Sequence, residues 1–166
     1  MAESFLRVET GGGVARLTLA RPDKHNAFDD ALIAELTAAL EAAGGDKAVR
    51  VVVLAGEGKS FSAGADLGWM KRMAAYGDAE NLADARALAN LMRALNDLPK
   101  PTVARVQGAA YGGGVGLVAC CDIAIAASSA KFCLSEAKLG LIPSVISPYV
   151  VAAMGSRAAR RYFLTS

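Results

Sequence analysis

The sequence has little net charge, a single histidine and no long uninterrupted apolar run. Eighteen Lys and Arg residues against sixteen Asp and Glu leave a formal charge of +2, too little and too evenly spread to indicate nucleic acid or an anionic membrane surface as a partner. The longest apolar stretch, near residues 113–127, is interrupted by Asp122, and MAESFLRVET lacks the basic-then-apolar pattern of a signal peptide. We therefore expect a cytoplasmic protein with a small-molecule partner and no membrane or nucleic-acid partner.

Cysteine is also scarce. The three residues Cys120, Cys121 and Cys133 include an adjacent pair that cannot easily bridge, lie among apolar residues and lack the spacing of metal ligands. The sequence therefore predicts buried free thiols and no metal site. With 54% hydrophobic and 20% charged residues, the 166-residue chain has the composition of one globular domain over residues 1–166.

Strand and helix patterns alternate along the chain, which predicts the α/β class. A hairpin is expected over residues 4–9 and 14–20, and Asp29 opens a helix with Leu32, Ile33, Leu36 and Leu40 on one face. Further helices are expected from Asp78 to Leu98, from Gly113 to Cys121 and around residues 146–164. Strands are expected at residues 50–58, 101–108, 123–126 and 131–133.

Three familiar motifs for nucleotide binding or nucleophilic catalysis are incomplete in this sequence. A phosphate-binding loop ending in LAGEGKS needs glycine where Val53 stands, and GGGVGL places Leu117 where a dinucleotide fingerprint needs its third glycine. A Ser/His/Asp triad would depend on His25, which lies in a turn, and the chain has no nucleophile elbow. These failures argue against NTP, nicotinamide and triad chemistry, and we expect no cofactor.

Two glycine-containing turns remain to be explained. SFSAGADL (60–67) and GAAYGGGVGL (108–117) each lie between a strand and a helical segment. Such turns expose backbone N–H groups near a helix N-terminus, where they can stabilise an oxyanion or enolate. Two such sets of exposed amides can together donate hydrogen bonds to one carbonyl oxygen.

The motifs RPDKHNAF, FSAGADL, QGAAYGGGVGL, CDIAIA and FCLSEAKLGLIPS, in this order, resemble the enoyl-CoA hydratase/isomerase (crotonase) family. The resemblance covers essentially the whole chain. It implies a spiral of ββα turns, acyl-CoA thioester substrates in which coenzyme A is part of the substrate, and an oxyanion hole on the backbone amides of Ala65 and Gly113. It also implies a homotrimer or dimer of trimers. YFLTS ends in a helical segment without a cap, so we expect the family's C-terminal helical region to be missing here.

Family hydratases carry two glutamates for proton chemistry. The later one is present as Glu136 in FCLSE, whereas Gly116 stands where the earlier one belongs. A single glutamate resembles the family's isomerases, in which one carboxylate moves a proton between two carbons. The sequence of residues 112–126 and 132–151 instead resembles that of bacterial methylglutaconyl-CoA hydratases of leucine breakdown. This resemblance predicts hydration of a short, branched or carboxylated 2-enoyl-CoA.

The resemblance implies a coenzyme A site beside the oxyanion hole, at Lys24, His25, Ala27, Ala63, Asp66, Leu67 and Gly112. For residues 24–27, a turn that caps the next helix is an equal alternative, and Asp66 fits a helix N-terminal carboxylate better than a catalyst. Two other functions stay open: an enoyl-CoA isomerase that uses Glu136 alone, and a non-catalytic acyl-CoA binding protein. Whether Glu136 activates water alone is also open.

Overall fold

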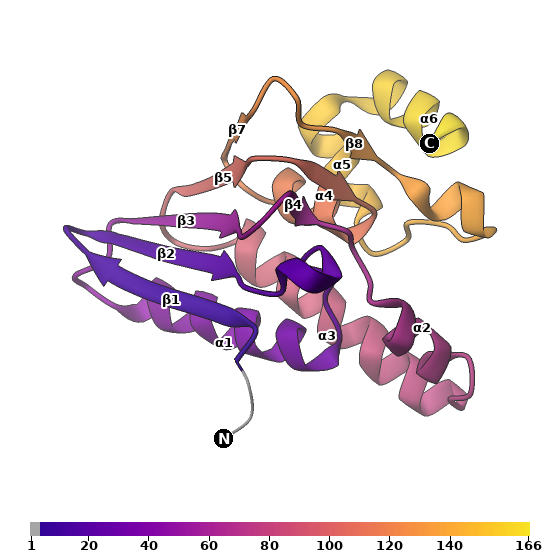
Figure 1. The fold of residues 1–166 in the computed structure, drawn as a ribbon, viewed down its shortest axis with the longest axis horizontal. Coiled ribbons are helices and arrows are strands. Elements are labelled where there is room, and N and C mark those ends of the chain that lie inside the picture. The colour runs from indigo at the N-terminus through magenta and orange to yellow at the C-terminus, as the bar shows by residue number, and fades with distance from the viewer. Residues whose placement is uncertain (1–3) are drawn as a thin grey trace.

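The computed structural model describes residues 4–166, whose strands form two sheets (Figure 1). In the larger sheet, β1 and β2 form an antiparallel hairpin, and β3, β5 and β7 then follow in parallel in the order β1-β2-β3-β5-β7. The smaller sheet has the parallel order β4-β6-β8. The strands are β1 (Leu6–Gly11), β2 (Val14–Leu19), β3 (Val51–Gly56), β4 (Ser60–Ser62), β5 (Thr102–Val106), β6 (Ala109–Tyr111), β7 (Ile123–Ala126) and β8 (Phe132–Cys133).

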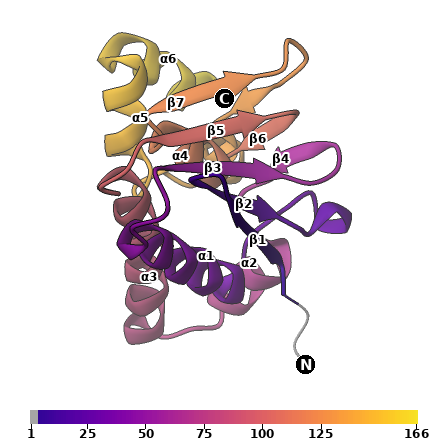
Figure 2. The same cartoon turned by 90° about the vertical axis from the view of Figure 1, so that its left-hand side faces the viewer.

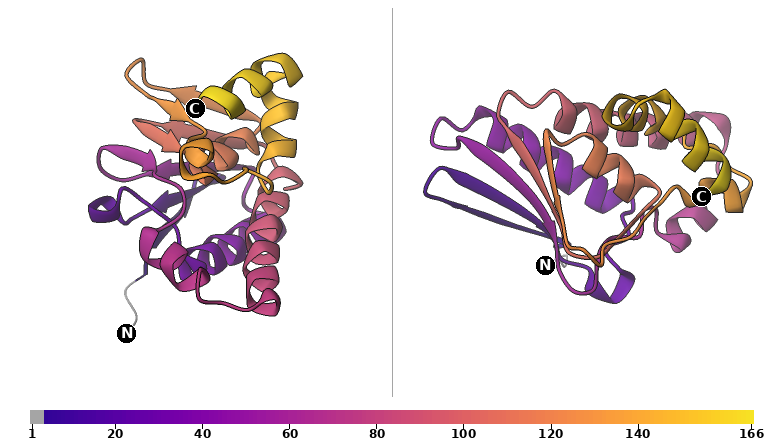
Figure 3. Two further views of the ribbon diagram at one scale, coloured as in Figure 1. Left: turned by 90° about the vertical axis from the view of Figure 1, so that its right-hand side faces the viewer. Right: turned by 90° about the horizontal axis from the view of Figure 1, so that it is seen from above.

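Three strands of the larger sheet, β3, β5 and β7, are each followed closely by a short strand of the smaller sheet and then by helical segments. This repetition is the spiral of ββα turns that the resemblance implied. Helices α1 and α3 cover one face of the larger sheet, and α5 and α6 lie beside the last turns of the spiral (Figure 2, Figure 3). The helices are η1 (Pro22–Lys24), α1 (Asp30–Gly45), α2 (Leu67–Met73), α3 (Asp78–Asn96), α4 (Gly113–Ala119), η2 (Ser135–Leu139), α5 (Ser147–Met154) and α6 (Ser156–Thr165).

The apolar faces of α1 and α3 build the core against the larger sheet. The Asp29 side chain accepts a hydrogen bond from the Leu32 N–H at 3.1 Å, so α1 begins where the sequence predicted. Its predicted face is confirmed, because all four of its named residues are buried: Leu32, Ile33, Leu36 and Leu40.

Two parts of the secondary-structure prediction were wrong. The single helix expected around residues 146–164 is two helices, because Gly155 has φ 81° and ψ 153°, a backbone conformation that no helix can include. Strands β4 and β6 were not expected, since three-residue strands are too short to show an alternating pattern.

The cysteines are free thiols, as predicted. Burial raises the pKa of the Cys120 and Cys121 thiols to about 12, so both are protonated and unreactive near neutral pH. Cys121 and Cys133 are half-buried, so the predicted burial is confirmed for Cys120 alone. Within residues 4–166, none of the helices combines the length and apolarity needed to span a bilayer.

Candidate functional site

The turn between β2 and α1 is fixed onto the segment that follows β3. Asn26 is fully buried in the left-handed region at φ 54°, and its side-chain amide donates to the Glu57 and Ser60 carbonyls at 2.8 Å each. The Ser62 hydroxyl donates to the Asn26 carbonyl at 2.9 Å. These bonds hold residues 21–28 against residues 57–66, so the first predicted glycine turn is rigid before any ligand binds.

The Ala65 amide is presented outward by a short parallel bridge to Phe28. The Phe28 N–H donates to the Gly64 carbonyl at 2.8 Å, and the Asp66 N–H donates to the Phe28 carbonyl at 2.9 Å. In a parallel pairing, the residue between the two bonded neighbours directs its own N–H away from the partner. Across residues 4–166 the Ala65 N–H finds no acceptor, which is the condition for an oxyanion donor.

The Gly113 amide lies close to this segment. Gly113 is the first residue of α4, so its N–H has no partner within the helix, and it finds none elsewhere in the described chain. A Cβ built on Gly64 would lie 3.2 Å from the Gly113 nitrogen, which places the two glycine turns side by side. The structure therefore brings together the two segments that carry the predicted oxyanion donors.

Glycine is required at both 112 and 113. Gly112 has φ 50°, a conformation that L side chains rarely adopt, and its N–H donates to the Cys133 carbonyl of β8 at 2.9 Å. A Cβ on Gly113 would overlap the Cζ atom of the Phe28 ring. The N-terminus of α4 thus packs between β8 and the Phe28 ring.

Glu136 reaches the same place from η2. A Cβ built on Gly112 would lie 3.2 Å from Glu136 Oε1, so the carboxyl group lies directly beside Gly112. The other oxygen, Oε2, is buried and has no hydrogen-bond partner in the described chain. Desolvation by burial raises the pKa of Glu136 above its ordinary value of 4.5, only partly offset by the bond from its own backbone N–H. The carboxyl group is therefore suited to taking up a proton.

The residues predicted to bind coenzyme A are distributed along the same turn. Lys24, His25 and Ala63 are exposed, and the Ala63 N–H donates to the His25 carbonyl at 2.9 Å. Ala27 is buried, and its carbonyl accepts a hydrogen bond from the Arg21 guanidinium at 3.1 Å. This carbonyl is therefore already hydrogen-bonded within the protein. Leu67 is 69% exposed at the start of α2.

Asp66 is the N-cap of α2. Its carboxylate accepts from the Gly68 and Trp69 N–H groups at 2.7 Å and 3.1 Å. Desolvation would raise its pKa, but these two bonds and the charges of Arg21 and Lys24 outweigh it, so the pKa is lowered. The expectation that Asp66 serves as a helix N-terminal carboxylate is confirmed.

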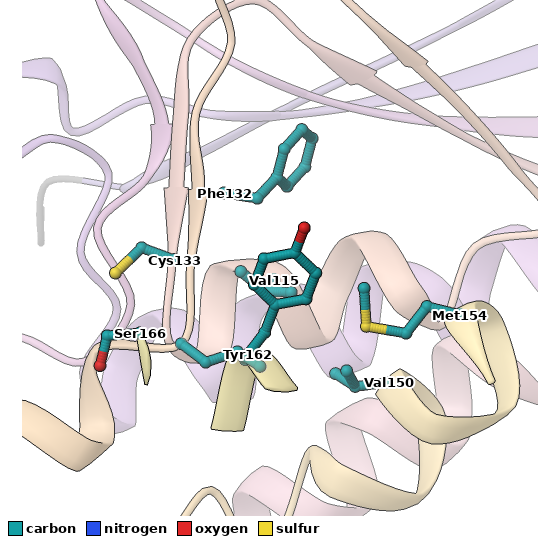
Figure 4. A pocket seen from close by; sticks show the side chains of 8 residues that line it. Val115, Phe132, Cys133, Val150, Met154, Tyr162 and Ser166 are labelled. Atoms are coloured by element: carbon teal, nitrogen blue, oxygen red, sulfur yellow. The ribbon is translucent and has the colours of Figure 1, made fainter. Parts of the chain in front are cut away.

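An apolar pocket of about 380 Å³ lies among α4, β8, α5 and α6 (Figure 4). The Tyr162 ring projects into it from α6, and Val115 and Leu134 line it two residues away from Gly113 and Glu136. None of the predicted site residues lines this pocket. Within residues 4–166, no group of three or more His, Cys, Asp or Glu side chains is placed to hold a metal ion.

The enoyl-CoA hydratase/isomerase family model matches residues 9–166. The chain belongs to this family. Among enoyl-CoA hydratase/isomerase proteins, it is similar to an enoyl-CoA hydratase of Alternaria alternata, with 40% identity over 154 residues that cover 93% of this chain and 50% of that protein. It is also similar to the 1,2-epoxyphenylacetyl-CoA isomerase of Escherichia coli strain K12, with 38% identity over 156 residues that cover 93% and 59%.

The crystal structure of an enoyl-CoA hydratase from Shewanella pealeana superimposes with a TM-score of 0.95 at 55% identity, covering 98% of this chain and 61% of that one. The fold is thus the crotonase fold of this enoyl-CoA hydratase/isomerase family. The chain spans about half to three fifths of the length of these relatives.

Sequence reasoning missed the residues that support the site. Phe28 packs on Gly113, and Arg21 donates to Asp29 at 2.9 Å and lies 3.5 Å from Asp66. Both residues lie at the ends of the RPDKHNAF motif, but no local pattern shows which other segments of the chain they contact. Ile146, which lies against Gly116, was missed for the same reason.

Proposed function

We propose that this chain carries the site at which water is added to, or removed from, the 2,3 double bond of a short or branched enoyl-CoA such as methylglutaconyl-CoA. One observation carries the proposal: the half-buried Glu136 carboxyl, whose Oε2 is buried and unpartnered within residues 4–166, lies beside Gly112, and the neighbouring Gly113 N–H has no acceptor in the described chain. A proton-transfer group next to an oxyanion donor is the arrangement that enolate chemistry requires. The resemblance of residues 112–126 and 132–151 to bacterial methylglutaconyl-CoA hydratases is the ground for this choice of substrate.

In the proposed hydration, the Ala65 and Gly113 N–H groups hold the thioester oxygen. The Glu136 carboxylate accepts a proton from water as the water oxygen bonds to C3, and the 2,3 double bond electrons move onto the thioester as an enolate. Glu136 then returns the proton to C2, the enolate collapses, and the 3-hydroxyacyl product forms. A raised pKa suits Glu136 to both steps, because it makes the carboxylate a stronger base towards water, and the protonated form then delivers the proton to C2.

A second candidate is isomerisation of a 3-enoyl-CoA, which Gly116 favours because no carboxylate stands there. Glu136 would take a proton from C2, and the oxyanion hole would hold the dienolate. Return of that proton to C4 would give the 2-enoyl isomer. A non-catalytic acyl-CoA binding protein, the third candidate, would bind the thioester without either conversion.

The experiment supplies the chain with a 2-enoyl-CoA and, separately, with its 3-enoyl isomer, and records product masses. The hydratase proposal predicts that the 2-enoyl substrate gains the mass of one water and loses its conjugated absorbance. Conversion of the 3-enoyl substrate with no hydroxyacyl product would establish the isomerase in its place. Binding without turnover of either thioester would contradict both enzymatic candidates.

A further inference from the structure

Gly116 faces two apolar side chains, one from α3 and one from the residue that directly precedes α5. A Cβ built on it would overlap Ile146 Cγ2 and would lie 2.9 Å from Ile146 Cβ and 3.3 Å from Met92 Cε of α3. Ile146 is 3% exposed and Met92 is fully buried, so neither side chain has free space into which it can move. The volume that any side chain at 116 would need is therefore already filled.

Position 116 lies one helical turn beyond the residue that Glu136 adjoins. Gly116 follows Gly112 by four residues, and its N–H donates to the Gly112 carbonyl at 3.3 Å, so the two residues lie one turn apart at the start of α4. Glu136 Oε1 lies beside Gly112, the N-cap of α4. A carboxylate at 116 would therefore begin one turn away from the neighbour of Glu136, in the volume that Ile146 occupies.

The position of Ile146 is fixed by its own helix. It directly precedes α5, and its carbonyl accepts from the Val150 N–H at 3.1 Å. As a β-branched residue it has few alternative rotamers, and rotation would keep a branch near α4. Gly116 and Ile146 are consequently a matched pair, with the smallest residue on one helix and a branched one on the other.

We propose that Ile146 is a specificity-determining residue: by filling the side-chain volume of position 116, it keeps a second carboxylate out and restricts the site to reactions in which Glu136 takes up and returns one proton. The chemical half of this inference rests on the proposed function of Glu136, whereas the packing half does not. No other group then has to donate a proton, so the protons balance on Glu136 alone. Ile146 acts only through the volume of its apolar side chain.

The packing half is tested by thermal unfolding of Gly116→Ala on three backgrounds: the natural chain, Ile146→Ala, and the control Val150→Ala. Alanine normally stabilises a helix relative to glycine, so any loss reports the overlap. We expect Gly116→Ala to lower the melting temperature by about 3 °C or more on the natural and Val150→Ala backgrounds. On Ile146→Ala the loss should be less than half as large, and an equal loss would overturn the proposal.

The reach of position 116 is tested by placing glutamate there. Gly116→Glu is made on the Ile146→Gly or the Ile146→Ala background, whichever melts higher, and the Glu136 carboxyl is titrated by infrared difference against Glu136→Gln. A neighbouring carboxylate should raise the pKa of Glu136 relative to the background variant. An unchanged titration would show that position 116 does not reach Glu136 and would also overturn the proposal.

The chemical half is read from the ratio of 2-enoyl hydration to 3-enoyl isomerisation. With a second carboxylate in place, this ratio should rise about tenfold or more over that of the natural chain. An unchanged ratio, with both carboxylates shown by titration to interact, would contradict the specificity role of Ile146. If the natural chain turned over neither substrate, the proposed function would fail, while the melting and titration results would still decide the packing half.

Discussion

At the residue scale, the site depends on atoms that are left without partners. Glu136 Oε2 and the N–H groups of Ala65 and Gly113 all lack a partner within residues 4–166. Leaving a buried polar group unsatisfied costs stability; two buried side-chain oxygens in the described chain lack a partner, Gln107 Oε1 and Glu136 Oε2, and the second belongs to the residue that family resemblance implied. The site is thus set up to satisfy Glu136 Oε2 and the two N–H groups with a substrate.

Gly113 offers a direct test of the oxyanion hole. Gly113→Ala should reduce turnover of a 2-enoyl-CoA by up to about 10²-fold, because the new Cβ overlaps the Phe28 ring and displaces the amide. Gly45→Ala is the control, since a Cβ at Gly45 meets no atom within 4 Å. Steady-state kinetics on both variants check this, and full turnover by Gly113→Ala would contradict the claim that the overlap with Phe28 displaces the donor amide.

The raised pKa of Glu136 makes a prediction about stability. Because the folded chain holds this proton more tightly than the unfolded chain, the contribution of Glu136 is fully present below its ordinary pKa of 4.5 and is lost as the pH rises through the raised value. The melting temperature of the natural chain should therefore fall relative to that of Glu136→Gln between acidic and neutral pH. A difference that stays constant, or that grows with pH, would show that burial does not raise this pKa.

At the element scale, the β2–α1 turn and the start of α2 act as one support. Arg21 links them, because its guanidinium donates to Asp29 at the start of α1 and lies 3.5 Å from Asp66 at the start of α2. Both acids cap their helices, and Ala65 directly precedes Asp66. The position of the first oxyanion amide is therefore set by two helix starts and one half-buried arginine.

Removal of the α2 cap should destabilise this support. Asp66→Ala is expected to cost about 1 kcal/mol of unfolding free energy, because the Gly68 and Trp69 N–H groups lose their acceptor. Asp66→Asn keeps an acceptor oxygen and should retain most of that stability. Urea denaturation of the two variants decides the matter, and equal losses would mean that the charge of Asp66, not its capping bond, stabilises α2.

At the scale of the whole molecule, apolar side chains are exposed mainly on the last turns of the spiral. Ile125 of β7 is 60% exposed, Ile142 is 80% exposed and Leu164 of α6 is 76% exposed. In Figure 1, β7, β8 and α6 all lie in the upper part of the molecule. Exposed apolar surface of this kind is typical of faces that bury against further protein.

The predicted homotrimer or dimer of trimers can be tested on this surface. Light scattering should give three or six times the mass of the chain, and Ile142→Asp should shift the distribution towards smaller species, because a charge is costly in an apolar interface. A Glu9→Gln variant, on the exposed part of β1, is the control and should leave the mass unchanged. A monomeric natural chain would contradict the prediction for residues 1–166.

The sequence predicted the segments that form the site better than the residues that hold these segments in place. FSAGADL, GGGVGL and FCLSE predicted the segments that meet, because motif order survives without knowledge of distances. The packing of Phe28 on Gly113 and of Ile146 on Gly116 joins residues that are far apart in the chain, so no local pattern could predict it. The short strands β4 and β6, which align these motifs, were missed for lack of periodicity.

The central claim is that Glu136 carries out the proton transfers on an enoyl thioester held by two backbone amides. The most direct test is the turnover of a 2-enoyl-CoA by the natural chain and by Glu136→Gln, with thioester binding measured for both. The account predicts unchanged binding and a turnover lower by about 10²-fold or more in the variant. Near-normal hydration by Glu136→Gln would contradict it.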